Sequence, residues 1–283
     1  MTTTHTLNTE ETDLVYDVRG PLPPADGRPA LVMIGQPMTA DGFATLAGYF
    51  PDRTVITYDP RGLGRSARKD GRTDHDPKVQ AEDLHALVEA LGVGPVEVFG
   101  SSGGAVTGLA WVTAHPEDII TLVAHEPPIF GLLPDAEVAF RAREHMRDVY
   151  LAGGAGAGFA TFMTLTSWPG EFTDAYFEQP LPPSDIPDDG SRDDPLLTER
   201  SWAVSGYQPD VEALARVPSR VVIAVGVESE NVLTGRTAQA TAKALGTDAV
   251  VFPSHHGGFL GPEFGYPGQP EAFAARLREV LAG

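Results

Sequence analysis

Short apolar runs alternate with helical patterns along most of this sequence. Six of these runs are predicted to be buried strands, at residues 30–34, 54–58, 96–99, 119–124, 220–225 and 249–252. A further pair of strands is expected within residues 6–19. This alternation is typical of a mostly parallel sheet with helices covering both faces.

Two helices are marked by their end residues and by their apolar spacing. Asp76 suits the cap of the first helix, Pro77 suits its first position, and Gly92 suits its exit. Its apolar side chains recur at i, i+3, i+4 and i+7, at Leu84, Leu87, Val88 and Leu91. The same spacing follows Pro270 near the C-terminus, so we expect both helices to pack against the sheet.

The alternation stops between residues 129 and 213. This stretch contains helical patterns, a patch rich in glycine and alanine at 152–157, and the tryptophans Trp168 and Trp202. A run rich in proline and aspartate at 179–195 is expected to form a long loop or a mobile flap. We therefore predict a core formed by residues 1–128 and 214–283, with a cap inserted at 129–213.

Composition and charge narrow the range of possible functions. The 283 residues include no cysteine, which excludes disulfides, thiolate metal sites and thiol nucleophiles. The formal net charge of −19 would repel phosphate backbones and anionic lipid, so we expect neither a nucleic-acid nor a membrane partner. The first residues contain no signal-peptide pattern and no stretch is long enough to span a membrane, so a cytoplasmic location is expected.

The candidate nucleophile is Ser102, in the middle of Gly100-Ser101-Ser102-Gly103-Gly104. This G-x-S-x-G pattern follows an apolar strand and precedes a predicted helix over residues 103–115. A turn this tight holds its central residue in a strained conformation and needs small neighbours. The side chain of Ser101, the neighbouring serine, is expected to point away from the site.

A second motif gives the pattern a family context. The sequence from Asp59 to Ser66 reads D-x-R-G-x-G-x-S and resembles a loop of α/β-hydrolases. The resemblance covers nearly the whole chain. It implies the α/β-hydrolase fold, with a mostly parallel central sheet, helices on both faces and an inserted, largely helical cap.

The resemblance also implies where the general base lies. These enzymes place a histidine between the last strand and the final helix, and here that position contains His255 and His256. The family pattern favours His256, with His255 as the alternative. A serine hydroxyl needs such a base because it is a weak nucleophile while protonated.

The acid departs from the usual family pattern. The position that commonly contains an aspartate is Ser229, with Glu228 and Glu230 on either side. The other candidate is Glu126, which follows the strand at 119–124. The chain is similar to zearalenone lactone hydrolases at this point, since these have a serine-rich turn and take their acid from a His-Glu-x-Pro stretch. We favour Glu126 and leave Glu228 and Glu230 open.

The remaining site residues are expected around the nucleophile. An oxyanion hole needs two N–H donors, for which we expect Gly103 and Gln36, because Pro37 has no N–H. Met38 is expected to form a wall of the pocket. Trp202 resembles a cap tryptophan of the lactonases and is expected either to line the pocket or to pack inside the cap.

These residues predict a serine hydrolase that cleaves a small-molecule carboxylic ester or lactone through an acyl-enzyme. We expect no cofactor and no metal site, and the sequence leaves the oligomeric state open. Two alternatives on the same fold are a carbon–carbon bond hydrolase and a non-hydrolytic relative, either a cofactor-free lyase or a binding protein. Serine at position 102 argues against epoxide hydrolases and haloalkane dehalogenases, which use aspartate there.

Overall fold

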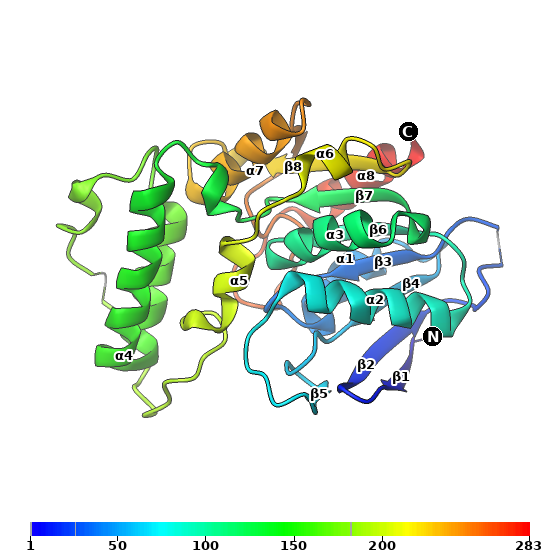
Figure 1. Ribbon diagram of the computed structural model, residues 1–283, viewed down its shortest axis with the longest axis horizontal. Helices are drawn as coiled ribbons and strands as arrows, with labels where there is room; N and C mark the ends of the chain where they lie inside the picture. Colours follow the sequence, from blue (N-terminus) through cyan, green and yellow to red (C-terminus); the bar gives the residue numbers. More distant parts are fainter. Residues whose placement is uncertain (1, 26, 182) are drawn as a thin grey trace.

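The computed structural model describes residues 2–25, 27–181 and 183–283. Within these ranges nine strands form one sheet in the order β1-β2-β4-β3-β6-β7-β8-β9, with β5 paired to β2 (Figure 1). The strands are β1 (Thr2–Asn8), β2 (Thr12–Arg19), β3 (Leu31–Ile34), β4 (Val55–Tyr58), β5 (Ala67–Arg68), β6 (Val96–Ser101), β7 (Ile119–His125), β8 (Arg220–Gly226) and β9 (Val250–Phe252). From β4 to β9 every pair is parallel, whereas β2 pairs antiparallel with β1, β4 and β5.

Helices cover both faces of the sheet. The α-helices are α1 (Ala44–Gly48), α2 (Pro77–Leu91), α3 (Gly103–Ala114), α4 (Ala136–Ser167), α5 (Trp202–Ser205), α6 (Val211–Leu214), α7 (Leu233–Ala244) and α8 (Pro270–Ala282). Single 3-10 turns are η1 (Ala40–Phe43), η2 (Pro116–Asp118), η3 (Phe130–Leu132), η4 (Asp174–Tyr176), η5 (Glu199–Ser201) and η6 (Val227–Ser229). Helices α2, α3 and α7 share one hydrophobic core with the sheet, and α1 and α8 share a second core with its other face. The predicted fold class is therefore confirmed.

The local sequence signals agree with these elements. The six predicted buried strands are all present, and the first hairpin begins at Thr2, earlier than expected. Asp76 caps α2 by accepting a hydrogen bond from the backbone N–H of Lys78 at 2.9 Å, and Gly92 ends the helix at φ 59°. In α8, Phe273 and Leu277 are fully buried, as the apolar spacing predicts.

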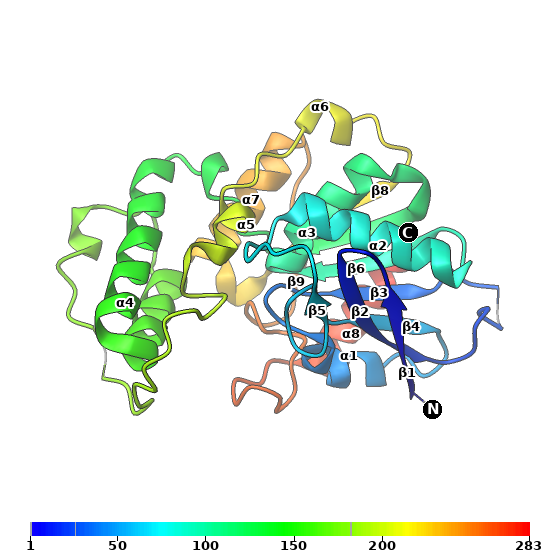
Figure 2. The same ribbon diagram turned by 60° about the horizontal axis from the view of Figure 1, so that its bottom comes forward.

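Residues 129–213, which we call the cap segment, run from η3 to the start of α6, and α4 lies beyond one end of the sheet (Figures 1 and 2). Helix α4 breaks at Gly154, where φ is 76° and ψ is −168°. A Cβ at this position would lie 2.2 Å from the carboxyl group of Asp188, so both the turn and the close approach require glycine. The patch rich in glycine and alanine is thus a turn between two helical halves. The run at 179–195 has no helix or strand in its described part, and Pro182 lies outside the described residues.

The cap segment has its own hydrophobic core, which includes Phe130, Tyr150 and Leu165 and reaches Leu233 on α7. A buried ion pair fixes this arrangement, because the carboxylate of Asp135 binds the guanidinium of Arg236 on α7. The segment is therefore anchored to the sheet through α7. Among the described residues, no helix is both long enough and apolar enough to cross a membrane.

Candidate active site

Ser102 stands in the tight turn between β6 and α3. Its backbone has φ 56° and ψ −125°, a conformation that L-residues rarely adopt. The turn also needs small neighbours, since a Cβ at Gly104 would lie 2.2 Å from the carbonyl oxygen of Ile34. Strand β6 and helix α3 therefore hold the half-buried Ser102 at the carboxyl edge of the parallel strands.

Ser101 has a different environment. Its side chain is buried, and its hydroxyl oxygen lies 3.4 Å from Nδ1 of His125. Burial lowers the pKa of His125 to about 4, so this histidine is neutral near neutral pH. Ser101 thus faces the buried side chain of His125 on β7. Of the two serines, only Ser102 lines the cavity described next.

A cavity of about 100 Å³ opens above Ser102, between the sheet and the cap segment. His256 is in its wall together with Ser102 and Gly103. Most of the other walls are apolar. They are formed by Pro37, Pro128, Phe130, Met146, Phe162, Leu165, Leu196, Val204 and Leu233.

Glu126 and His256 are hydrogen-bonded to each other. Nδ1 of His256 lies 2.6 Å from Oε2 of Glu126, and Oε1 of Glu126 accepts the backbone N–H of Gly226 at 2.8 Å. Glu126 comes from the end of β7, whereas His256 comes from the loop after β9. Both carboxylate oxygens therefore have partners, although the side chain of Glu126 is 0% exposed.

The surroundings of Glu126 stabilise its ionised form. Burial alone would raise the pKa of this carboxyl group, but the hydrogen bond from His256 lowers it well below its usual range. A carboxylate in this position fixes the proton of His256 on Nδ1. The other ring nitrogen, Nε2, is then free to accept a proton in the cavity.

The other candidates for base and acid lie elsewhere. Glu228 and Glu230 are exposed, and neither is bonded to a histidine among the described residues. Ser229, at the usual position of the acid, is buried. His255 stacks on Tyr266 at 4.0 Å and accepts a hydrogen bond from the N–H of Gly257, and it does not line the cavity with Ser102.

The predicted oxyanion donors lie close together in the cavity wall. Gln36 and Gly103 both line the cavity, and they are so close that a Cβ on Gly103 would lie 2.6 Å from the carbonyl oxygen of Gln36. The N–H of Gly103 is the first of α3 and has no acceptor within that helix.

Met38 is not where we expected it, because its side chain packs between Gly35 and Gly42 against a buried core. The preceding Pro37 lines the cavity instead.

The cap segment contributes more to the cavity than the sequence indicated. Trp202 lines it, which is the first of the two roles expected for this residue. Phe130, Arg143 and Met146 line it as well, and we did not predict these three from the sequence. The spacing of three between Arg143 and Met146 places them on one face of α4 and is a signal in the sequence, but it does not reveal what that face covers.

The motif from Asp59 to Ser66 supports the site without lining it. The carboxylate of Asp59 accepts the backbone N–H groups of Ala40 at 3.0 Å and Arg65 at 2.8 Å. Arg61 forms a buried ion pair with Asp83 on α2. These contacts fix the loop after β4 against the start of η1 and against α2.

Two other features of the described residues lie outside this cavity. His85, His115 and Asp118 have ligand atoms within 4.8 Å of one another, outside the cavity. The two imidazole rings stack in parallel at 3.7 Å, so their nitrogen lone pairs do not converge on one ion.

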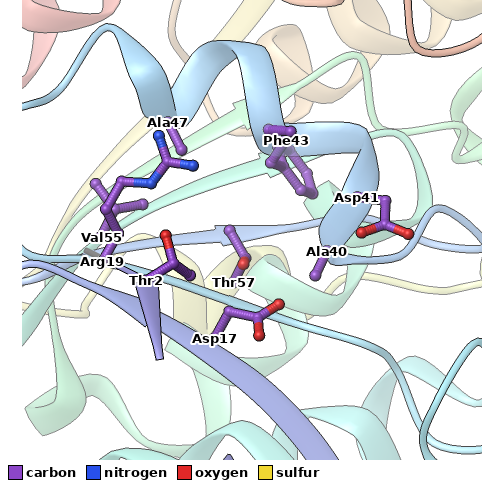
Figure 3. Close-up of a pocket in the computed structure, with 10 residues that line it drawn as sticks. Thr2, Asp17, Arg19, Ala40, Asp41, Phe43, Ala47, Val55 and Thr57 are labelled. Carbon is purple, nitrogen blue, oxygen red and sulfur yellow. The ribbon is translucent and has the colours of Figure 1, made fainter. Parts of the chain in front are cut away.

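A second cavity of about 150 Å³ lies between α1 and the first strands (Figure 3). Its described lining contains neither serine nor histidine, so we place the candidate active site at Ser102.

Comparison with known proteins identifies the family. Residues 29–175, more than half of the chain, match the family described as alpha/beta hydrolase fold. The chain belongs to the α/β-hydrolase family. The mostly parallel sheet and the strained turn between strand and helix at Ser102 agree with this family.

Relatives of this α/β hydrolase cover nearly its whole length. The sequence is 28% identical over 282 residues to a Bacillus subtilis (strain 168) protein named uncharacterized hydrolase YraK, covering 98% of this chain and 95% of that protein. A solved esterase from Thermogutta terrifontis is 19% identical with a TM-score of 0.65, and the match covers 98% of each chain. Proline iminopeptidase from Mycobacterium smegmatis is 20% identical with a TM-score of 0.65, covering 99% of this chain and 98% of that one. At these identities the two structures show the shared fold alone.

Proposed function

We propose that this α/β hydrolase cleaves a carboxylic ester or lactone through an acyl-enzyme on Ser102. The observation that carries the proposal is the 2.6 Å contact between Glu126 Oε2 and His256 Nδ1, in the wall of the cavity that Ser102 lines. A buried carboxylate, an oriented imidazole and a serine in a strained turn are the parts that nucleophilic acyl transfer needs.

In the proposed reaction these residues act in sequence. Ser102 Oγ attacks the carbonyl carbon while Nε2 of His256 takes the hydroxyl proton. The tetrahedral oxyanion is stabilised by the N–H groups of Gln36 and Gly103. His256 then gives its proton to the departing alkoxide, and a water molecule repeats the sequence on the acyl-enzyme and releases the acid. Glu126 stays ionised throughout and stabilises the imidazolium.

The cap segment sets the substrate range in this proposal, and residues 1–128 with 214–283 form the catalytic core. The apolar walls and Trp202 suit a substrate with an extended apolar or aromatic part. The resemblance of the His125–Pro128 stretch to zearalenone lactone hydrolases supports including macrolactones among the candidate substrates. The same triad also performs carbon–carbon bond hydrolysis in related enzymes, so this class belongs in the substrate panel.

The test is hydrolysis of a panel containing p-nitrophenyl esters, lactones including zearalenone, a vinylogous 1,5-diketone and a prolyl amide. We expect turnover of esters or lactones that Ser102→Ala lowers by about 10³-fold or more. Ser101→Ala is the matched control, since it removes the same hydroxyl one residue away and should retain most activity. Equal turnover in the wild-type and Ser102→Ala proteins would contradict the proposal, and turnover of the diketone or the prolyl amide alone would replace the ester assignment.

A further inference from the structure

Arg143 brings a positive charge into the mostly apolar cavity above Ser102. It lies on α4 and lines the cavity together with Trp202 and Ser205. Its Nη1 donates a hydrogen bond to the hydroxyl of Ser205 at 2.7 Å, and its guanidinium lies 4.2 Å from the centre of the Trp202 ring. The cation is therefore held in one orientation by the cap segment.

Among the described residues, this cation has no carboxylate within ion-pair distance. None of the described carboxylates forms an ion pair with Arg143, in contrast to its neighbour Arg147, which is bonded to Asp148 at 2.6 Å. Burial is the main reason why the pKa of Arg143 falls to about 10, and Arg147 lowers it further while Glu144 opposes the shift. A half-buried cation without a counterion is unfavourable, and proteins normally pair such groups.

Several N–H donors around the cavity are also without acceptors. Nε of Arg143, Nε1 of Trp202 and Nε2 of Gln36 are buried and find no hydrogen-bond partner among the described residues. The Arg143 hydrogen bonds to described residues all come from Nη1, which leaves the edge formed by Nε and Nη2 unpaired. That edge has the two parallel N–H donors that match the two oxygens of a carboxylate.

We propose that the substrate of this site carries a carboxylate that pairs with Arg143, separate from the ester or lactone carbonyl attacked by Ser102. The substrate class is thus a half-ester of a dicarboxylic acid, or a lactone with a free acid group. This inference rests on the proposed function and deepens it. The recognition is local, because the net charge of −19 gives the protein as a whole no attraction for an anion.

The first experiment compares two esters that differ only in charge. They are the mono-p-nitrophenyl ester of adipic acid and the same compound with its free acid converted to a methyl ester, both assayed at pH 7.5. The wild-type protein should prefer the acid in kcat/KM. Arg143→Met should reduce kcat/KM for the acid by about 10- to 100-fold, with a much smaller effect on the methyl ester, because it removes one charge-assisted contact.

Two variants separate charge recognition from structure. Arg147→Met removes a cation that lies over the same Trp202 ring at 4.9 Å but does not line the cavity, so it should leave the preference for the acid unchanged. Arg143→Lys keeps the charge and should restore part of the preference. If Arg143→Met lowers both substrates equally, or if the wild-type protein has no preference, Arg143 only positions Trp202 and Ser205 and the inference is wrong, while the proposed function stands.

A second experiment needs no turnover. Binding of monomethyl adipate and dimethyl adipate to the Ser102→Ala protein is measured by calorimetry, with and without Arg143→Met. Tighter binding of the monoacid that disappears with Arg143→Met supports the inference even if the protein hydrolyses no ester in the panel. Equal binding of the two compounds to Ser102→Ala would overturn it.

Discussion

Replacing Glu126 with glutamine tests the orientation of the candidate base with almost no change in shape. The two carboxylate oxygens accept N–H groups from Gly226 at 2.8 Å and from His256 at 2.6 Å. A glutamine has only one acceptor oxygen. Since the backbone N–H of Gly226 cannot rotate away, the amide oxygen must face it, and the amide NH₂ then faces Nδ1 of His256.

The consequence is the wrong tautomer of His256. Nδ1 must accept from the new NH₂ group, so the ring proton moves to Nε2 and the imidazole can no longer take the proton of Ser102. The loss of the carboxylate also removes the stabilisation of the imidazolium. In a serine protease the corresponding change from aspartate to asparagine lowers kcat by about 10⁴-fold, and we expect a loss of about 10³- to 10⁴-fold here. The free energy of unfolding should fall by about 1.5–3 kcal/mol, the usual contribution of a hydrogen bond to a charged group.

The assay is hydrolysis of the best p-nitrophenyl ester by Glu126→Gln, with Glu228→Gln and Glu230→Gln as controls that carry the same chemical change on exposed side chains. The two controls should stay within about twofold of the wild-type protein, since they touch neither the cavity nor His256. A loss smaller than tenfold for Glu126→Gln, or an equal loss in either control, would refute the assignment of the acid.

Two further predictions concern stability. The buried His75 has a pKa of about 4, mainly because of burial, whereas an unfolded histidine has its usual value near 6.5. Between these values the unfolded chain binds the extra proton, so the free energy of unfolding falls as the pH drops from 6.5 toward 4. In urea titrations at several pH values, His75→Phe should flatten this slope by up to about 1.4 kcal/mol per pH unit. An unchanged slope would contradict the burial argument. Arg236→Met should lower the free energy of unfolding in urea by about 3 kcal/mol, because it leaves the buried carboxylate of Asp135 without its cation. The control Arg216→Met, in an exposed ion pair, should lower it by less than about 1 kcal/mol. Equal costs would mean that the contact to α7 does not hold the cap segment.

Much of the fold is predictable because its signals are local. A cap residue such as Asp76, an exit glycine such as Gly92 and a run of apolar residues each act within a few positions of the chain. The turn at Ser102 is local in the same sense, since β6 and α3 are contiguous with it. The break of α4 at Gly154 is less visible, because the need for glycine there comes partly from Asp188, 34 positions away.

The site is less predictable because its partners meet only in three dimensions. The sequence favoured Glu126 but left Glu228 and Glu230 open, because all three follow strands whose ends meet at the same edge. The backbone conformation at Glu126, with φ 49°, directs its side chain to His256, and no residue pattern encodes that angle. Arg143 was missed for a related reason: an arginine on a helix is normally solvated, and only the packing of α4 over the cavity buries this one.

The most direct test of the central claim is covalent labelling with a fluorophosphonate followed by mass spectrometry of the intact protein and its peptides. A serine that His256 activates should take one phosphonyl group, so we predict a single adduct on the peptide containing Ser102. Ser101→Ala should be labelled at a rate similar to the wild-type protein, and Ser102→Ala should not be labelled. An unlabelled wild-type protein, or an adduct that persists in Ser102→Ala, would contradict the assignment of Ser102 as the nucleophile.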